Sequence, residues 1–453
     1  MKTIAAVATP PGEGGIAVIR VSGDEALDIA SKVFVPAGGR DVSAMKGYTA
    51  CYGELRDGET RFDDGVLLVY RAPHSYTGED TAELSCHGGI YAAQRALRAC
   101  FNAGAVPAQA GEFTKRALLN GKLSLTQAEA VADMISAQNE QFLLCCEAQR
   151  EGALYRKIRD ISGRLLELIT LIQAWIDYPD EMEDEFDGKL EADRLRSIAD
   201  DLDRLLESYS EGQMTRSGLP CAIVGRPNAG KSTLMNLLTG TERSIVTDIE
   251  GTTRDTVEET VMLGDLMLRL ADCAGIRDTS DAVESIGIDR MLKKTNEAAL
   301  VFAVFDSSRP LSDEDERLIK LLNGKRTVCV INKTDLEEKA DTERLEKLFE
   351  YTVRISAKNG DSLETLAEAA AKASGAGRLD LNSGFIANER QRKCAAEAAE
   401  SVSQALGALE SGMTLDAVGV LCENALDRLY ELSGEQVSEN VVEQVFSRFC
   451  VGK

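Results

Sequence analysis

The sequence contains no run of eighteen apolar residues, and this absence excludes a helix that spans a membrane. The amino-terminal stretch MKTIAAVATPPGEGG has one lysine and a short apolar segment that soon meets Pro10, Pro11 and Gly12, so it does not read as a signal peptide. The eleven cysteines lack the spacing of a zinc site, and the one adjacent pair, Cys145 and Cys146, lies in a helical stretch. We therefore expect reduced thiols in a cytoplasmic protein, without a disulfide scaffold.

Positive charge is scarce. The chain has 51 Lys and Arg residues against 75 Asp and Glu residues, which gives a net charge of −24. Phosphate groups are bound through Lys and Arg, so this composition does not favour a wide nucleic-acid-binding face. If RNA is a substrate, local basic patches or a basic partner must help to bind it. Acidic residues gather in the stretch 177–188, which we expect to be a solvated loop between helices.

The first part of the chain has the pattern of a mixed domain. A length of 453 residues predicts about two to four domains. Stretches 14–23, 64–73 and 81–89 alternate or are continuously apolar between Gly and Pro residues, which predicts strands. Residues 91–104 predict a helix that ends at a glycine. We interpret residues 1–118 as an α+β domain.

Long helices are predicted after this domain and again near the end of the chain. Apolar residues repeat at three- and four-residue steps at Ile158, Ile161, Leu165, Leu168, Ile172 and Ile176, at Leu195, Ile198, Leu202 and Leu205, and at Leu415, Val418, Cys422, Ala425, Leu429 and Leu432. We predict a helical domain in two parts, 119–215 and 379–453, with an α/β domain inserted at 216–378. Glycines at 374–378 lie near this last boundary. The expected fold class is therefore a multidomain α/β protein, and no internal repeat is visible.

The stretch CAIVGRPNAGKSTLMNLL predicts a phosphate-binding loop between a strand and a helix. Gly225, Gly230, Lys231 and Ser232 match the pattern G-x-x-x-x-G-K-[ST]. Glycines let backbone N–H groups approach a phosphate closely, and the start of a helix attracts negative charge. We expect Lys231 to reach the β- and γ-phosphates and Ser232 to bind Mg²⁺. The alternative is a tight turn without a ligand, which the strand-loop-helix context disfavours.

Three further motifs follow in the order of a GTPase. The stretch 266–275 predicts a strand ending in Asp272, which would hold Mg²⁺ through water, and Gly275 would donate an N–H to the γ-phosphate. A second buried strand, 327–335, ends in Asn332, Lys333 and Asp335.

The last of these motifs completes a site for guanine. A carboxylate at Asp335 can accept hydrogen bonds from N1–H and from the exocyclic amine of guanine, a donor pair that adenine lacks. Ser356 and Ala357, at the end of the stretch 353–360, would contact the base oxygen through their backbone. The predicted GTP site contains Asn228, Ala229, Gly230, Lys231, Ser232, Thr233, Thr247, Asp248, Ile249, Glu250, Gly251, Thr252, Thr253, Asp272, Cys273, Ala274, Gly275, Asn332, Lys333, Asp335, Ser356, Ala357 and Lys358.

Two local features differ from a small GTPase of the common type. Ile276 occupies the position where many such enzymes have a glutamine that orients water, so another group must do this. Glu284 is the best candidate for this catalytic role, although it could also be an ordinary surface residue. Asn228 lies inside the phosphate loop and, with carbonyls of the following stretch 246–255, could hold a monovalent cation in place of an arginine finger. Thr253 would then be the second Mg²⁺ ligand.

The chain ends in FSRFCVGK, and this ending has three interpretations. A prenylation signal fits poorly, because Gly452 is not aliphatic and Lys453 is not a typical last residue. The segment could instead be a frayed end without function. In the third interpretation the tail, with its thiol at Cys450, folds back into a site.

These motifs together resemble one family along the full chain. The stretches TIAAVATPPGEGGIAVIRVSG, SYTGEDTAELSCHGG, GEFTKRALLNGKLSLTQAEAVADMI, GRPNAGKSTLMN, IVTDIEGTTRD, AGIRDTSDAVESIGIDR and FCVGK are similar to the MnmE (TrmE) tRNA-modification GTPases. Cys273 replaces the threonine of the family's usual DTAG motif, and Val451 replaces the isoleucine of its usual CIGK ending.

The resemblance implies an amino-terminal domain that binds a tetrahydrofolate derivative, either 5-formyl- or 5,10-methylene-tetrahydrofolate. The family's folate positions correspond to Arg20, Glu83, Lys122 and Lys453. A carboxylate is suited to the pterin donors, and cations attract the glutamate tail of folate. The tail would return to this site and place Cys450 near the one-carbon unit, where a thiolate is nucleophilic.

The resemblance also implies a reaction and its partners. Family members are homodimers that act in a heterotetramer with MnmG, a partner that uses FAD and NADH. Together they add an aminomethyl or carboxymethylaminomethyl group to C5 of the wobble uridine of certain tRNAs. The implied potassium ligands are Asn228, Thr247, Ile249 and Thr252, and Glu284 matches the family's water-orienting glutamate.

Two other functional classes share parts of this pattern. A regulatory GTPase switch would have almost the same GTPase motifs, but it does not require the folate-like domain or the cysteine tail. A stand-alone folate enzyme with a degenerate GTPase domain is disfavoured because all four nucleotide motifs are intact.

Overall fold

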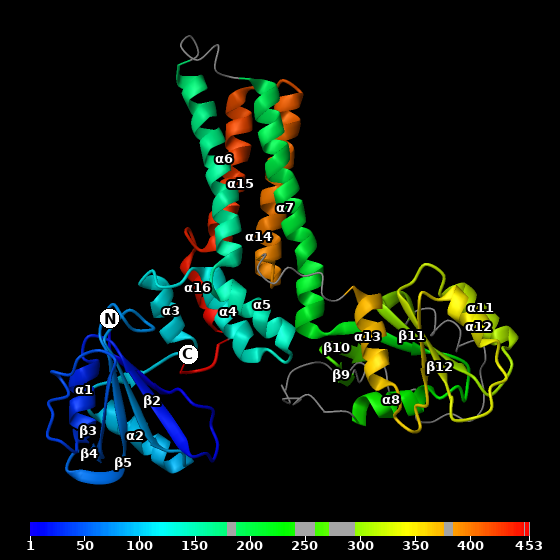
Figure 1. The fold of residues 1–453 in the computed structure, drawn as a ribbon. Coiled ribbons are helices and arrows are strands. Elements are labelled where there is room, and N and C mark those ends of the chain that lie inside the picture. Colours follow the sequence, from blue (N-terminus) through cyan, green and yellow to red (C-terminus); the bar gives the residue numbers. More distant parts are fainter. Residues whose placement is uncertain (179–186, 241–258, 271–294, 376–383, 448, 453) are drawn as a thin grey trace. The chain divides into compact units, whose positions relative to one another are not determined.

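A computed structural model describes residues 1–453 except for 179–186, 241–258, 271–294, 376–383, 448 and 453 (Figure 1). The described chain divides into two compact units, and each contains one β-sheet. The first unit contains 1–132, 149–199 and 397–453, and the second contains 133–148 and 200–396. The predicted domain boundaries at 118, 215 and 378 stay predictions. No helix in the described ranges is long and apolar enough to cross a membrane.

A seven-stranded sheet forms the amino-terminal part of the first unit, in the order β3-β4-β5-β6-β2-β1-β7. Its strands are β1 (Ile4–Val7), β2 (Ile16–Ser22), β3 (Phe34–Pro36), β4 (Thr49–Asp57), β5 (Thr60–Tyr70), β6 (Thr81–His87) and β7 (Val106–Pro107). Alternate residues of these strands, such as Ile19, Leu67 and Leu84, are buried against α1 (Ala26–Val33) and α2 (Ile90–Asn102). The three predicted strands and the predicted helix are present, and β5 ends before Pro73, which has no N–H for a sheet ladder.

Helices form the remainder of the first unit. They are α3 (Glu112–Leu119), α6 (Ala153–Asp177), α15 (Leu415–Ser433) and α16 (Glu439–Phe446), with α4 (Leu125–Ser136) up to residue 132, the beginning of α7 (Gly188–Ser217) and the end of α14 (Glu389–Glu410). Helices α6 and α15 run alongside each other (Figure 1). Their predicted apolar stripes are largely buried, with Ile176 and Leu415 half-buried. An ion pair of 2.6 Å between Arg196 and Glu410 joins α7 to α14.

The second unit contains a six-stranded sheet in the order β13-β12-β11-β8-β10-β9. Its strands are β8 (Leu219–Val224), β9 (Glu259–Leu263), β10 (Leu266–Leu270), β11 (Leu300–Asp306), β12 (Thr327–Asn332) and β13 (Tyr351–Ile355), and only β9 is antiparallel to its neighbour. Helices α8 (Lys231–Gly240) and α13 (Leu363–Ser374) pack on one face, and α11 (Asp313–Leu321) and α12 (Thr342–Leu348) on the other.

Burial on both faces explains the continuous apolar runs of the second sheet, because a parallel sheet covered on both sides has no solvent-facing row. Every residue of β11 and of β12 is buried. Strand β8 has later strands on both sides, β11 and β10, which creates a change of strand order next to it. Ligands of such sheets bind outside the carboxyl ends of the strands at this position.

The second unit also contains α5 (Glu140–Arg150) up to residue 148, together with the end of α7 and the start of α14. The two parts of the predicted helical domain thus flank the inserted sheet in sequence. With an α+β sheet domain, helices from two chain segments and an inserted α/β sheet all present, the predicted multidomain α/β fold class is confirmed.

Candidate functional site

The phosphate loop connects β8 to α8 and is shaped by close backbone approaches. A Cβ atom on Gly225 would lie 2.4 Å from the carbonyl oxygen of Val304, and one on Gly230 would lie 2.0 Å from Nδ2 of Asn332. Gly230 also has a φ of +101°, which side chains rarely allow. Since α8 begins at Lys231, the free N–H groups of its first turn lie at the end of this loop.

The ammonium group of Lys231 lies over the same loop. Its Nζ donates hydrogen bonds of 2.8 Å to the carbonyl oxygens of Gly225 and Arg226. Burial lowers the pKa of Lys231 from its usual value. The next two side chains, Ser232 and Thr233, are exposed at the start of α8. This arrangement gives one cation and accessible hydroxyl groups beside the loop that would receive phosphates.

Asn332 connects three of the predicted motifs. It is the last residue of β12, and its Nδ2 donates a 2.9 Å bond to the carbonyl oxygen of Ala229 in the phosphate loop. Its Oδ1 accepts a 3.0 Å bond from the backbone N–H of Ala357. The amide is buried, so both bonds form away from water, where leaving either group unpaired is costly. Asn332 therefore holds the phosphate loop and the two base-recognition loops together.

The base-recognition carboxylate has a partner of its own. The hydroxyl of Ser356 donates a 2.8 Å bond to Oδ1 of Asp335. Asp335 and Lys358 are exposed, whereas Ser356 and Ala357 are buried. An oriented, accessible carboxylate beside a fixed backbone is suited to the N1–H and amine donors of guanine.

Several predicted site residues lie outside the described residues. They are Thr247, Asp248, Ile249, Glu250, Gly251, Thr252, Thr253, Asp272, Cys273, Ala274, Gly275 and Glu284. Their roles at the γ-phosphate, at both metals and at the attacking water stay predictions.

Two charged groups that support the site were not predicted from the sequence. Asp306 ends β11, and its carboxylate lies 2.7 Å from Nζ of Lys333. Arg226 of the phosphate loop lies 3.6 Å from the buried carboxylate of Asp315 in α11. A charged residue at the end of a continuous apolar run was the available signal for Asp306. No sequence pattern links Arg226 to Asp315, because a loop and a distant helix make this contact.

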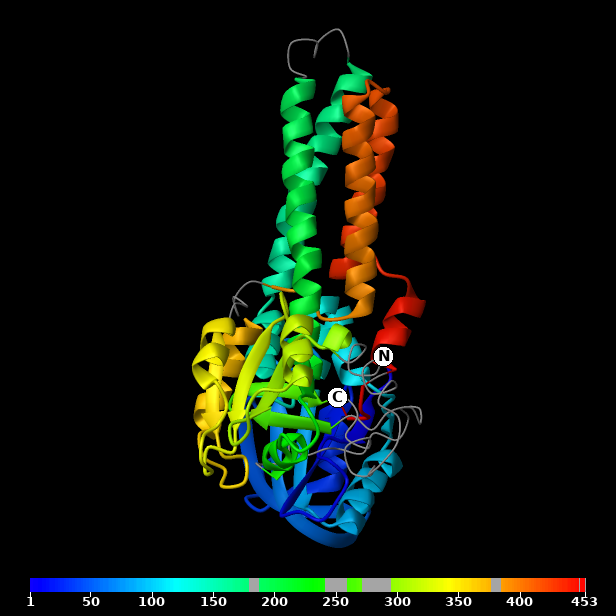
Figure 2. The ribbon, with the colours of Figure 1, turned by 90° about the vertical axis from the view of Figure 1, so that its right-hand side faces the viewer.

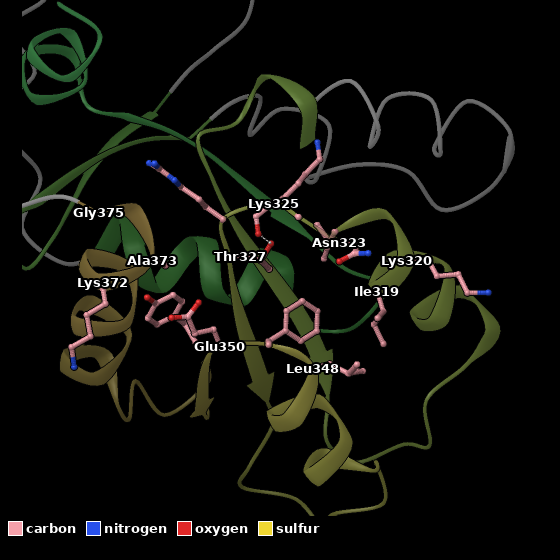
Figure 3. Close-up of a pocket in the computed structure, with 15 residues that line it drawn as sticks. Ile319, Lys320, Asn323, Lys325, Thr327, Leu348, Glu350, Lys372, Ala373 and Gly375 are labelled. Atoms are coloured by element: carbon pink, nitrogen blue, oxygen red, sulfur yellow. Dashed lines mark hydrogen bonds between the residues drawn. The ribbon is translucent and has the colours of Figure 1, made fainter. Parts of the chain in front are cut away.

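A hollow in the second unit lies where strands β12 and β13 begin, at the edge of the sheet opposite the phosphate loop. It has a volume of about 680 Å³ and is lined by residues 319–327, 348–351 and 372–375 in part, including the starts of β12 and β13 (Figure 3). Lys320, Lys325 and Lys372 extend away from its centre (Figure 3). Nζ of Lys325 donates a 2.8 Å bond to the carbonyl oxygen of Thr295 and a 2.6 Å bond to Oδ1 of Asn296. The lysine side chains do not point toward a common position where phosphates could bind (Figure 3). The phosphate loop is therefore the better candidate for the nucleotide site.

A different polar cluster lies on the sheet of the first unit. Arg20 in β2 and Glu83 in β6 are directly opposite each other in the sheet register, and their side chains form a 2.8 Å ion pair. The Arg20 guanidinium also lies 5.7 Å from the ring centre of Tyr76 and 5.6 Å from that of Phe113. Both charged side chains remain about one-fifth exposed. Arg20 and Glu83 therefore present a joint, oriented polar surface.

The carboxyl-terminal segment reaches this cluster. The backbone N–H of Gly111 donates a 3.3 Å bond to the carbonyl oxygen of Cys450, and Val451 forms an antiparallel bridge with Ala110. Nη1 of Arg20 donates a 3.5 Å bond to the carbonyl oxygen of Gly452. Figures 1 and 2 show this red segment beside the blue amino-terminal domain. The tail is therefore folded back onto the amino-terminal domain and is not frayed, and its entry into a functional site stays a prediction.

Packing fixes the approach of this tail. Phe446 and Phe449 have ring centres 5.1 Å apart and pack with Leu125 in a small apolar core. A Cβ on Gly452, which has a φ of +100°, would lie 2.3 Å from the carbonyl oxygen of Val7. The thiol-bearing residue Cys450 is exposed. The tail is thus anchored on both sides of an accessible cysteine.

The other two predicted folate residues are placed differently. Nζ of the exposed Lys122 donates a 3.0 Å bond to the carbonyl oxygen of Pro73, and Lys453 lies outside the described residues. The structure therefore brings together Arg20, Glu83 and the tail backbone, and a folate role for Lys122 and Lys453 stays a prediction.

Comparisons with known proteins cover nearly the whole chain. A family model described as the MnmE helical domain matches residues 125–450, and one described as the GTP-binding protein TrmE N-terminus matches residues 3–122. Proteins named tRNA modification GTPase MnmE are similar at 37% identity in Clostridioides difficile, 36% in Acetivibrio thermocellus and 38% in Thermoanaerobacter pseudethanolicus. Each alignment covers 100% of this chain and 99% of the relative.

A solved structure, the G domain of the FeoB iron transporter of T. maritima, matches 34% of this chain and 97% of its own with 28% identity. Its TM-score of 0.26 is too low to assign the fold of this chain. The family models and the full-length relatives establish the family, because they match the sheet domain, the helices and the inserted nucleotide site in a single chain. This chain belongs to the MnmE (TrmE) family of tRNA modification GTPases.

Proposed function

We propose that this GTPase, acting with an MnmG-like partner that uses FAD and NADH, adds an aminomethyl or carboxymethylaminomethyl group to C5 of the wobble uridine of certain tRNAs. The carbon comes from a tetrahydrofolate derivative bound near Arg20 and Glu83. The observation that best supports this proposal is the return of the tail to that pair, through the 3.5 Å contact between Arg20 and Gly452. A GTPase that acts only as a switch has no use for an anchored cysteine beside a polar cluster.

The chemistry of the amino-terminal cluster fits a folate derivative. Glu83 can accept hydrogen bonds from pterin donors, and Arg20 holds the Glu83 carboxylate in place through their 2.8 Å ion pair. Tyr76, which is 38% exposed, gives this cluster an aromatic surface, and the buried Phe113 packs beneath Arg20. The folate derivative supplies a one-carbon unit when bound, and the residues of this chain would orient it beside Cys450.

Association with other chains also follows from the surface. The sheet face opposite α1 and α2 exposes Ile16, Tyr52 and Val66 at 66%, 58% and 40%, and Tyr52 pairs directly with Val66. Apolar side chains of this kind support a homodimer through the amino-terminal domain. In the proposed heterotetramer the MnmG-like partner contributes much of the tRNA contact, because a chain with a net charge of −24 offers little attraction for phosphates.

The nucleotide chemistry is proposed to use two metal ions. Ser232 is exposed at the start of α8, where it can bind Mg²⁺ together with Thr253. Asn228 is an exposed residue of the phosphate loop and has a φ of +63°. This conformation supports a K⁺ site formed by Asn228 with Thr247, Ile249 and Thr252, the last three of which lie outside the described residues.

Nucleoside analysis of tRNA tests the proposed function directly. Cells that lack this chain should lose the modified wobble uridine, and cells complemented with the full chain should recover it. Unchanged wobble uridine in the deletion strain would favour a regulatory switch instead.

Glu284→Ala is expected to lower GTP turnover by about 100-fold or more and to leave GTP affinity nearly unchanged. Ile276 cannot orient water, so the role passes to Glu284, which acts mainly in the transition state. Single-turnover hydrolysis and nucleotide titration measure the two effects separately. A turnover rate close to that of the unmodified chain would assign the role to another residue.

Cys450→Ser is expected to abolish wobble-uridine modification and to retain both GTP hydrolysis and folate binding. Serine keeps the size and hydrogen bonding of the side chain but removes the thiolate. The measurements are reconstituted tRNA modification, phosphate release and folate titration. Cys51→Ser, at a half-buried cysteine of β4, is the matched control and should modify tRNA normally. Normal modification by Cys450→Ser would show that the thiol is not a catalyst.

Removal of residues 450–453 separates binding from chemistry. It takes away the carbonyl groups that contact Gly111 and Arg20, so folate affinity should fall, whereas basal GTP hydrolysis should remain. Unchanged folate affinity after this deletion would place the tail outside the folate site.

A further inference from the structure

The turn that follows β11 lies against the base-recognition loop although it belongs to none of the four nucleotide motifs. Asp306 is the last residue of β11 and pairs in register with Asn332, the last residue of β12. Its side chain is only 2% exposed. A buried carboxylate is expensive unless it is paired and hydrogen-bonded, so the partners of Asp306 decide what it does.

Both carboxylate oxygens of Asp306 have partners. Oδ2 accepts a 2.7 Å bond from Nζ of Lys333. Oδ1 accepts a 3.0 Å bond from the backbone N–H and a 2.6 Å bond from the hydroxyl of Ser308. Burial raises the pKa of Asp306, but the bonds from Lys333 and Ser308 outweigh this effect and the pKa is lowered. The group is therefore a fixed anion that holds the Lys333 ammonium in one place.

The adjacent Ser307 binds the same loop at both ends. Its backbone N–H donates to the carbonyl oxygen of Asn332 at 2.9 Å, and its hydroxyl donates to that of Lys333 at 3.0 Å. Its own carbonyl oxygen accepts bonds of 2.7 Å and 3.1 Å from the N–H groups of Lys339 and Ala340. Residues 306 and 307 thus contact both ends of the segment 332–340, and Asp335, which is proposed to bind guanine, lies within this segment.

Lys333 needs such support because of its backbone. Its φ of +66° lies in the left-handed region, which costs a residue with a side chain free energy unless the surroundings enforce it. The ion pair to Asp306 fixes the side chain of this residue, and the Ser307 hydroxyl fixes its carbonyl group. The position of Asp335, two residues further along, depends on that conformation.

We propose that Asp306 is a positioning residue for guanine selectivity, which acts through Lys333 and touches no nucleotide itself. The inference rests on the proposed GTP site. Loss of the Asp306 charge should let the segment 332–335 relax. Contacts to the N1–H and exocyclic amine of guanine should then weaken more than contacts to the phosphates, which Lys231 and the loop 225–230 provide.

The test compares binding of GDP and IDP by the full chain, because inosine lacks the exocyclic amine. Asp306→Asn keeps the shape and should weaken GDP binding about tenfold or more, the usual value of one charge-assisted hydrogen bond. IDP binding should weaken less, so the GDP preference over IDP should shrink. Lys333→Met should show the same loss, and the double variant should be no worse than Lys333→Met alone.

Controls separate positioning from folding. Glu316→Gln breaks an exposed ion pair with Arg344 in the same unit and should change neither affinity. If Asp306→Asn does not fold, Ser307→Ala removes one bond to Lys333 and should produce the same loss of selectivity on a smaller scale. An unchanged GDP-to-IDP ratio in a folded variant, or additive losses in the double variant, would overturn the inference. Failure of the unmodified chain to bind GDP would instead overturn the GTP site itself.

Discussion

Gly230→Ala is expected to lower GTP affinity by about 100- to 1,000-fold. The new Cβ would lie 2.0 Å from Nδ2 of Asn332, far inside the usual contact distance of about 3.5–4.0 Å. Asn332 must then move, which breaks its bonds to Ala229 and Ala357. Two bonds at about 1 kcal/mol each and about 1–2 kcal/mol for a side chain at a positive φ add up to about 3–4 kcal/mol, which corresponds to about 100- to 1,000-fold.

Titration with a fluorescent GDP analogue measures this loss, and the chain offers a matched control. Gly240 is the last residue of α8, the helix that begins directly after Gly230, and a Cβ there would meet nothing within 4 Å. Gly240→Ala should therefore bind as the unmodified chain does. Equal affinities for Gly230→Ala and Gly240→Ala would mean that the contact between the phosphate loop and Asn332 does not shape the nucleotide site.

GTP turnover is expected to be about 1,000-fold faster in KCl than in NaCl of equal ionic strength. An arginine finger is worth about 10³–10⁵ in rate in other GTPases, because it neutralises charge that develops in the transition state. We propose that K⁺ takes this place beside Asn228, whose exposed position in the phosphate loop leaves its side-chain oxygen accessible. Phosphate release measured in each salt gives the ratio.

Two variants assign the effect of the salt to the site. Asn228→Ala should remove most of the difference between KCl and NaCl, since it removes the side-chain ligand. Asn323→Ala changes an exposed asparagine at the opposite strand ends and should keep the full difference. Equal rates of the unmodified chain in the two salts would contradict the potassium proposal, whatever the variants show.

Much of the fold class and of the nucleotide site follows from short stretches of sequence. The run of apolar residues in β12, the glycines of the phosphate loop and the apolar stripe of α6 each reflect a local requirement: burial on both faces, close backbone approach and one covered helix face. Such requirements involve residues that are near each other in the chain, so a pattern with a fixed spacing reveals them.

What only the tertiary structure decided is which distant groups meet. Arg20 and Glu83 are 63 residues apart, Arg20 and Gly452 are 432 apart, and Asn332 and Ala229 are 103 apart. Each side chain alone reads as an ordinary polar or charged residue. Strand order, sheet register and the path of the tail bring them together, and burial strengthens the bond between Asn332 and Ala229 because water no longer competes for its polar groups. The sequence by itself thus determined the chemistry that is present, and tertiary packing determined that Asp306 holds Lys333 and that the cysteine tail lies beside Arg20.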